Sequence, residues 1–434
     1  MLIQFRVANF RSFNDPVTFS MVAANISAQD KHVDQNNVYQ VDKDLNLLKT
    51  TAIYGANASG KSNLIAALRF MKEFVLNSSK ESQAAEAIPV EPFRLSTTTM
   101  GKPALFEVVF LVDGTKYRYG FEVNLQQVVS EWLFHVPTIR EAKLFERAGD
   151  QFSIMPAFKE GKGLGSKTRD NALFLSVSSQ FNGKIAQKVL QWFKDLGIIN
   201  GLNDLGLRQY TASVFEQEEF KGDIIEFVKN LDVGIDDIQV RESPFNFSIP
   251  TEVPEELNGL FSELKKISER QEMQSQTVLT THRKFDRSGN YVSAEMFDID
   301  KEESEGTRKI FALAGPIIET LKNGDVLIID EFDARLHPLI TRAVINLFNS
   351  KDTNQTGAQL VFVTHDTNLL DKKIFRRDQV WFTEKDKLGA THLYSLAEYK
   401  ERNDASFEDN YVRGKYGAIP FIGDLNRLLG DPHE

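Results

Sequence analysis

Four short stretches of the sequence carry side chains that could do chemistry. The first, "GANASGKSN", has four residues between Gly55 and the run Gly60, Lys61 and Ser62. Glycines at this spacing let backbone N–H groups converge on a phosphate, and the helix that follows adds its positive N-terminal end. The pattern predicts that Lys61 reaches the β- and γ-phosphates of a nucleotide and that Ser62 binds Mg²⁺. The predicted nucleotide-binding residues of this phosphate loop are Gly55, Asn57, Ser59, Gly60, Lys61, Ser62 and Asn63.

Two adjacent carboxylates follow an apolar run in the second stretch, "GDVLIIDEFD". Residues 326–329 are typical of a buried parallel strand, and Asp330 and Glu331 come directly after them. Ligands bind at the carboxyl ends of such strands, so we expect both acids beside the phosphate loop. We expect Asp330 to hold Mg²⁺ and Glu331 to act as the general base that polarises the attacking water.

A histidine ends the third stretch, "QLVFVTHD". At the end of a strand, His365 could donate a hydrogen bond to a γ-phosphate, or it could be a hydrogen-bonded core residue. The other histidines show no metal-ligand spacing such as HExxH, and no GxSxG serine elbow is present. The chain has no cysteine, which excludes disulfides, zinc-thiolate sites and thiol catalysis.

The fourth stretch, "DKEESEGTRKIFALAG" (300–315), runs from charged residues into an apolar helix. Ser304 could simply cap that helix by accepting a backbone N–H. Alternatively, Ser304 and Gly306 could form an anion site at the helix N-terminus, because that end carries a partial positive charge. The pattern of residues by itself leaves both interpretations open.

The elements around these stretches indicate an α/β protein in three parts. The first part is 1–185, and its first 135 residues read mainly as strands, with one helix after the phosphate loop and a hairpin around Asp113 and Gly114. Residues 186–276 look helical and charged, which predicts a helical insertion without the long heptads of a coiled-coil arm. Residues 277–434 begin with a second hairpin and then alternate strands with helices.

Composition narrows the class of protein further. No run of about 18 apolar residues occurs and the N-terminus lacks an apolar signal block, so we expect no membrane association and a cytoplasmic location. The net charge of −10 argues against a generally basic nucleic-acid coat. Two local basic segments, 159–169 and 372–377, leave contact with nucleic acid open.

The order of the four stretches resembles that of the ATP-binding-cassette (ABC) ATPase superfamily, in particular its SMC-like branch. The resemblance covers roughly residues 1–75 and 300–434. It implies an ABC-type P-loop ATPase head with an antiparallel β lobe and a helical insertion. It also implies that ATP and Mg²⁺ are bound and ATP is hydrolysed in a homodimer, with Ser304 and Gly306 contacting the γ-phosphate held by the opposite subunit. The sequence departs from the family in lacking the full Leu-Ser-Gly-Gly-Gln signature, and Glu305 adds a negative charge there.

The same resemblance implies roles for three further residues. Arg11, in "NFRSF", matches an arginine that lies near the nucleotide in SMC-like heads. Asp333 falls where the superfamily has an aspartate in a loop that crosses the dimer. Gln180, in "NALFLSVSSQFN", is a counterpart of the glutamine that senses Mg²⁺ and water, and would bind both metal and nucleotide.

A narrower resemblance rests on "DEFDARLHPLI", "DQVWFTEKD" and "YVRGKYGAIPFI". These stretches are similar to the AbiL/RloA-like ATPases of prokaryotic abortive-infection operons, which are related to the OLD-family nucleases. OLD proteins continue into a TOPRIM nuclease domain, whereas this chain ends about 70 residues after His365, too soon for one. The resemblance therefore implies a separately encoded effector, such as a TOPRIM-like nuclease.

Together these features predict an ATP-driven dimer, with higher oligomers left open, that regulates a partner in antiviral defence. The alternative is a DNA-repair or chromosome-maintenance ATPase of the SMC or RecF kind that binds DNA directly. A transporter subunit is a third possibility, and the long insertion between residues 61 and 304 counts against it.

Overall fold

The computed structural model describes residues 1–28, 30–81, 83, 85–232, 234–244, 274–401 and 405–420. The chain divides into two compact units. The first comprises Met1–Gly201, Thr320–Ala334 and Thr341–Glu434, and the second comprises Leu202–Glu319 and Arg335–Ile340. The limits expected from the sequence (1–185, 186–276 and 277–434) were drawn from changes in composition and stay a prediction. Within the expected helical insertion (186–276), residues 245–273 lie outside the described residues.

An antiparallel sheet of seven strands forms one layer of the first unit. Its order is β10-β9-β8-β7-β6-β1-β2. The expected hairpin around Asp113 and Gly114 is confirmed: both residues have positive φ, which two-residue hairpin turns require. The strands are β1 (Leu2–Ala8), β2 (Val17–Ser20), β6 (Ala104–Val112), β7 (Thr115–Val123), β8 (Val128–Val136), β9 (Ala142–Ala148) and β10 (Gln151–Ile154).

A second sheet of six strands carries the expected chemistry. Its order is β11-β15-β16-β5-β17-β18, and every pair is parallel except β17 with β18. The three central strands β15, β16 and β5 are buried along their whole length, as expected for parallel strands covered on both faces. The strands are β5 (Thr50–Gly55), β11 (Gly197–Asn200), β15 (Val326–Asp330), β16 (Gln359–Val363), β17 (Val380–Lys385) and β18 (Thr391–Ser395).

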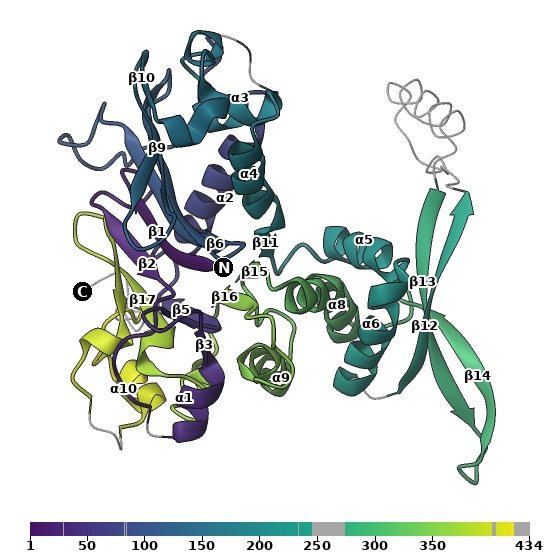
Figure 1. The fold of residues 1–434 in the computed structure, drawn as a ribbon. Helices are drawn as coiled ribbons and strands as arrows, with labels where there is room; N and C mark the ends of the chain where they lie inside the picture. Colours follow the sequence, from purple (N-terminus) through teal and green to yellow (C-terminus); the bar gives the residue numbers. More distant parts are fainter. Residues whose placement is uncertain are drawn as a thin grey trace, which may run out of the picture. The chain divides into compact units, whose positions relative to one another are not determined.

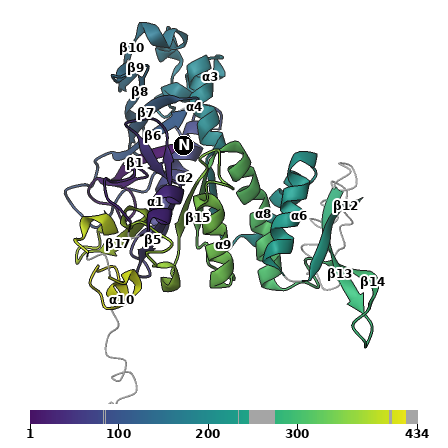
Figure 2. The same cartoon turned by 60° about the horizontal axis from the view of Figure 1, so that its bottom comes forward.

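Helix α2 (Lys61–Asn77) lies between these two sheets (Figures 1 and 2). The helix face expected from the sequence is buried, and residues of α2 share one core cluster with residues of both sheets. Phe70 and Phe74 contact Phe106 and Phe121 of the antiparallel sheet. One helix therefore joins the phosphate loop at its start to the β lobe near its end.

Shorter elements complete the first unit. Helix α4 packs against α2 and the antiparallel sheet, and α3 packs against both helices. These elements are α1 (Lys31–Asn37), β3 (Val38–Gln40), β4 (Asn46–Leu48), α3 (Phe174–Gln180), α4 (Lys184–Asp195), most of α9 (Pro338–Asn349) and α10 (Phe407–Val412).

In its described residues, the second unit combines three helices with a three-stranded sheet. The helices are α5 (Asp204–Phe215), α6 (Glu218–Leu231) and α8 (Glu305–Asn323), of which residues up to 319 belong to this unit. The antiparallel sheet has the order β12-β13-β14, formed by Ile235–Pro244, Gln274–Phe285 and Tyr291–Asp298. The pairing of β13 with β14 confirms the second expected hairpin. Among the described residues, no helix has both the length and the apolar character of a membrane span.

Candidate nucleotide site

The carboxyl ends of three parallel strands bring the predicted residues to one edge of the central sheet. Val363 of β16 is paired with Ile53 of β5, and Ile329 of β15 is paired with Phe362. The phosphate loop follows β5, Asp330 ends β15, and His365 comes two residues after β16. Segments nearly 300 residues apart in sequence therefore meet at the edge where α/β proteins bind ligands.

The phosphate loop depends on a glycine at position 60. Gly60 has a φ of +113°, a backbone conformation that residues with a Cβ atom rarely adopt. A Cβ atom there would also lie 2.3 Å from Oγ1 of Thr391. The loop leads directly into α2 at Lys61, so the first N–H groups of that helix have no acceptor within the helix and are placed to bind an anion.

Three residues that the motif did not predict support the loop from behind. Oγ1 of Thr383 lies 2.6 Å from Oγ of Ser59, and the Thr391 hydroxyl donates to the Ser59 carbonyl at 2.8 Å. The Ser12 hydroxyl donates to Oγ1 of Thr391 at 2.8 Å and accepts from the Asn63 side chain at 2.7 Å. The sequence motifs gave these residues no role at the loop, and the role of Thr383 and Thr391 arises from the pairing of β17 with β5 and of β18 with β17.

Lys61 is almost fully buried in the loop. Its Nζ donates to the carbonyls of Gly55 and Ala56 at 2.8 and 2.9 Å. Burial lowers the pKa of Lys61 from 10.5 to about 8, although Asp330, Glu331 and Asp333 act in the opposite direction. A bound triphosphate would place further negative charge beside the Lys61 amine. We therefore expect ATP to favour the protonated form of Lys61.

Ser62 and Asp330 are placed as a pair of oxygen ligands. The Ser62 hydroxyl donates to Oδ1 of Asp330 at 3.3 Å, and Asp330 is only 8% exposed. A hydroxyl and a carboxylate are ligands that suit Mg²⁺, which takes its remaining ligands from water and substrate phosphates. No group of three or more His, Asp or Glu residues in the described ranges could hold a metal alone. The donor set therefore fits a nucleotide-borne Mg²⁺.

Glu331, Asp333 and His365 lie together beyond this pair. Glu331 has a φ of +53°, an uncommon backbone conformation that turns the chain directly after β15. The backbone N–H of His365 donates to Oδ2 of Asp333 at 3.4 Å. Burial and the nearby charge of Lys61 lower the pKa of His365, while the carboxylates of Asp333 and Glu331 raise it less. A neutral imidazole at this edge can donate one hydrogen bond and accept another.

Arg11 lies close to the first turn of α2. It lines a cavity of about 630 Å³ together with Asn63 and Arg94, and its guanidinium donates to Glu91 at 2.7 Å. Asn63 belongs to the predicted loop residues, so the structure brings Arg11 to the same side of the loop. Arg11 and Arg94 thus line one cavity with a residue from the first turn of α2.

The structure does not bring Gln180 to the phosphate loop. Gln180 is the exposed last residue of α3, and α3 meets α2 where the Ser176 hydroxyl donates to the Val75 carbonyl. Val75 is 14 residues beyond Lys61, which corresponds to about 21 Å of helix. Since α3 packs at the far end of α2, we leave Gln180 out of the site proposed below.

Ser304 does cap its own helix in the second unit. Its hydroxyl oxygen accepts from the backbone N–H of Thr307 at 3.0 Å, and α8 begins at Glu305. Ser304 is nonetheless exposed, and a Cβ atom at Gly306 would contact no atom closer than 3.6 Å. The cap geometry and an anion site at the same helix end are compatible, since both use the partial positive charge of the first turn.

The negative charge of Glu305 has a cation beside it. Nε of Arg335 lies 3.6 Å from Oε2 of Glu305, and Nη1 of Arg335 lies 2.6 Å from Oδ2 of Asp204. Asp204 also contacts the fully buried Lys309 of α8 at 3.4 Å. Arg335 therefore offsets the negative charge that Glu305 adds next to Ser304.

Glu303, directly before Ser304, fixes the start of α8 to the three-stranded sheet. Its Oε1 accepts from the Thr280 hydroxyl and lies 2.6 Å from Nε2 of His282. The Glu303 side chain is only 8% exposed, so this contact is well shielded from water. A displacement of β13 would be transmitted to the residue that precedes Ser304.

Comparison with known proteins assigns the family. Residues 50–371, about three quarters of the chain, match the family described as "AAA domain, putative AbiEii toxin, Type IV TA system". The chain belongs to this family. A search of the curated proteins finds no match.

Solved structures of SMC heads are also similar to the chain. The SMC head domain from Thermotoga maritima is 13% identical with a TM-score of 0.40, covering 91% of this chain and 98% of that one. An SmcHead bound to the C-winged helix domain of ScpA is 14% identical with a TM-score of 0.41, covering 91% and 97%. An Smc head bound to the C-terminal domain of ScpA from Pyrococcus furiosus is 13% identical with a TM-score of 0.38, covering 96% and 98%.

The strand order and the family together define the fold. A phosphate loop between β5 and α2, acids at the end of β15, and an added antiparallel sheet make this a mixed α/β fold of the P-loop kind, in a chain of the AAA family. The fold and family expected from the sequence are thereby confirmed.

Proposed function

We propose that this family member hydrolyses ATP and uses the nucleotide to join two copies of itself, thereby regulating a partner protein in prokaryotic antiviral defence. The observation that carries the proposal is the meeting of Lys61, Ser62, Asp330, Glu331 and His365 at one edge of a parallel sheet. The charges of Asp330 and Glu331 raise the pKa of Lys61. The charge of Lys61 lowers the pKa of His365, and that of Glu331 raises it. These side chains are therefore close enough for their charges to act on one another.

Each residue has a distinct chemical task in this proposal. Lys61 and the N–H groups at the start of α2 bind the phosphates, and Ser62 and Asp330 hold Mg²⁺. Bound Mg²⁺ supplies charge neutralisation for the departing phosphate oxygens. Glu331 accepts a proton from the attacking water, and His365 donates a hydrogen bond towards the γ-phosphate.

The dimer is proposed because the exposed end of α8 has the character of an anion site. Ser304 is exposed, the helix is 19 residues long, and Arg335 offsets the charge of Glu305. A long helix presents a partial positive charge at its first turn, which suits the γ-phosphate bound by a second copy of the chain. In this proposal each copy completes the site of the other, and hydrolysis loosens their interface.

The defence role and the partner rest on the family. Its description names an AbiEii toxin and a type IV toxin–antitoxin system, which supports a function in a regulated pair of proteins. The partner that we propose is a separately encoded effector, as the resemblance to abortive-infection ATPases implies. The ATP-bound dimer would be the state that such an effector distinguishes from the monomer.

The test is the substitution Glu331→Gln. The amide keeps the size of the side chain but cannot accept the proton, so we expect hydrolysis to slow by about 100-fold or more. ATP should then accumulate in a dimer with twice the monomer mass in light scattering. Glu146→Gln, which alters an exposed glutamate on β9, serves as the matched control and should behave as the unaltered chain.

Two outcomes would contradict the proposal. Turnover equal to that of the unaltered chain would remove Glu331 from catalysis. A Glu331→Gln protein that binds ATP but stays monomeric at all concentrations would remove the two-copy site, while the assignment of the phosphate loop would stand.

A further inference from the structure

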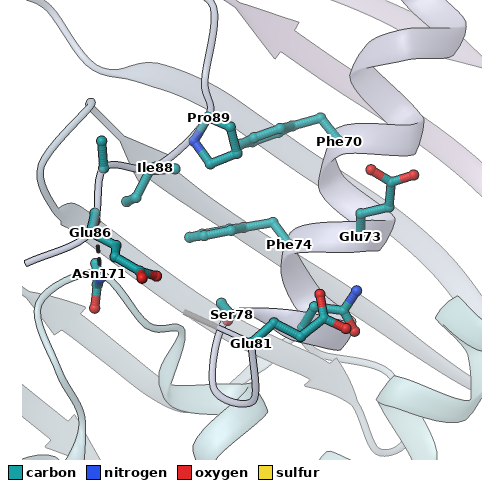
Figure 3. Close-up of a pocket in the computed structure, with 11 residues that line it drawn as sticks. Phe70, Glu73, Phe74, Ser78, Glu81, Glu86, Ile88, Pro89 and Asn171 are labelled. Atoms are coloured by element: carbon teal, nitrogen blue, oxygen red, sulfur yellow. Dashed lines mark hydrogen bonds between the residues drawn. The ribbon is translucent and has the colours of Figure 1, made fainter. Parts of the chain in front are cut away.

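A cavity near the C-terminal end of α2 has an apolar wall and an acidic rim. It has a volume of about 330 Å³ and belongs wholly to the first unit (Figure 3). Phe70 and Phe74 of α2 and Ile88 and Pro89 of the following segment line it. The two phenylalanine rings are stacked, with centroids 5.6 Å apart and planes 11° apart.

Three carboxylates border this cavity, and none forms an ion pair among the described residues, although the charge of nearby Lys72 acts on Glu73. Glu73, Glu81 and Glu86 line it, and none of the eleven lining residues is basic. All three glutamates are exposed, and no ion pair joins them to a lysine or arginine in the parts of the chain that the structure describes. Nearby Lys72 is occupied elsewhere, because its Nζ donates to the carbonyls of Lys194 and Leu196.

The helix itself adds to the negative potential. The cavity lies where α2 ends at Asn77, and the last turn of α2 contains no basic residue. The C-terminal end of a helix carries a partial negative charge, which a cation normally offsets. The helix end and the three carboxylates therefore favour the same charge in a ligand.

A buried hydrogen-bond acceptor lines the same cavity. Asn171 is 2% exposed, and its side-chain nitrogen donates to the carbonyls of Gln83 and Glu86 at 2.7 and 3.0 Å. Its Oδ1 is buried and has no hydrogen-bond partner among the described residues. A buried acceptor without a donor is costly, so a ligand N–H group that displaced the atoms covering Oδ1 would gain a hydrogen bond there.

We propose that this cavity binds an arginine side chain from a basic segment of a partner protein. Arginine combines an apolar stem with a flat cation that packs against aromatic rings and carries five N–H donors. The phenylalanine rings suit the stem and the flat face, while the carboxylates and Asn171 suit the donors. The binding chemistry stands on the cavity alone; that the partner is the regulated effector rests on the proposed function.

The δ1 methyl group of Ile88 provides a local probe, because Ile88 lines the cavity and is 2% exposed. The full chain, labelled with ¹³C at isoleucine methyl groups and free of nucleotide, is titrated with a short glycine–serine peptide that contains one arginine. The Ile88 resonance is assigned from Ile88→Val. We expect it to shift in a saturable way, weakly with the matched lysine peptide and not at all with the citrulline peptide.

Charge removal gives the second arm of the test. Binding of the arginine peptide should weaken by about threefold in each of the single variants Glu73→Gln, Glu81→Gln and Glu86→Gln. In the triple variant it should weaken by about tenfold or more. Glu218→Gln, on the exposed first turn of α6, should leave binding unchanged. Because these residues lie outside the nucleotide site, ATP turnover should not change in any of these variants.

The proposal is overturned if the triple variant binds as tightly as the unaltered chain, or if citrulline replaces arginine without loss. Free arginine that binds more tightly than the peptide would identify a small-molecule site and would overturn the partner segment. Since all titrations omit nucleotide, a failure here is distinct from the failure of Glu331→Gln to trap a dimer.

Discussion

The affinity for ATP should fall steeply above pH 8, because Lys61 loses its proton there. The pKa of Lys61 is lowered to about 8 by burial, whereas an unfolded chain would keep it near 10.5. The triphosphate is fully ionised above pH 8, since the last phosphate pKa lies near 6. Binding ATP at pH 9 therefore requires that the protein first takes up a proton on Lys61.

The magnitude follows from the fraction of Lys61 that is charged. With a pKa of about 8, that fraction is about nine tenths at pH 7 and about one tenth at pH 9. If ATP binds only the charged form, its dissociation constant should rise by about tenfold, or about 1.4 kcal/mol, between these pH values. Above pH 8 the slope should approach one proton taken up for each ATP bound.

Linkage also fixes the sign of the effect on stability. Between pH 8 and 10.5 the unfolded chain holds the Lys61 proton and the folded chain does not. This group therefore raises the free energy of unfolding as the pH rises through that window, provided that no nucleotide is bound. Its effects on stability and on ATP affinity thus run in opposite directions.

Calorimetry in buffers of different ionisation enthalpy measures both the affinity and the proton uptake. Ser62→Ala is the control: it should bind Mg²⁺-ATP less tightly but keep the same slope with pH, because Lys61 is intact. His365 should not contribute, since its pKa is lowered below 6.5. A flat affinity between pH 7 and 9.5, with circular dichroism showing a folded protein throughout, would refute the assignment of Lys61 as the phosphate-binding cation.

Three further substitutions test other parts of the structure. Gly60→Ala should abolish ATP binding and lower the free energy of unfolding by about 2 kcal/mol or more, because it adds a clash with Thr391 to an unfavourable φ. Gly101→Ala, with a similar φ sign but open space around it, should cost about 1 kcal/mol and keep ATP binding. Ser304→Arg should stop hydrolysis yet leave ATP binding to the monomer intact; full turnover in that variant would reduce Ser304 to a helix cap. Arg376→Met should destabilise the first unit by about 3–5 kcal/mol in denaturant titrations, since it leaves the buried Asp378 and the nearby Asp34 without their cation.

Local sequence patterns were sufficient where local geometry decides the structure. The phosphate loop follows from glycine spacing, because Gly60 needs a conformation that side chains disfavour. Helix α2 follows from apolar spacing on one face, and the two hairpins follow from their turns. Asp330 and His365 could be placed at strand ends since their strands are short, apolar and fully buried.

Resemblance without geometry misplaced one residue and overlooked others. Gln180 was expected at the nucleotide, but α3 packs against the far end of α2. Thr383 and Thr391 support the loop although no motif gave them a role at the nucleotide. The compensation of Glu305 by Arg335 was also invisible in the sequence, because the two residues are 30 positions apart and meet only in the folded second unit.

The sequence by itself determined which chemistry this protein can perform, since glycine spacing, strand-terminal acids and a helix with a serine at its start are local properties. The tertiary structure alone decided how those parts combine. The strand order β15-β16-β5-β17 places Asp330 beside Ser62, and the end of α2 meets residues 86–89 to form an acidic cavity. Strand order and cavity shape depend on contacts between residues far apart in the chain, which no short pattern encodes.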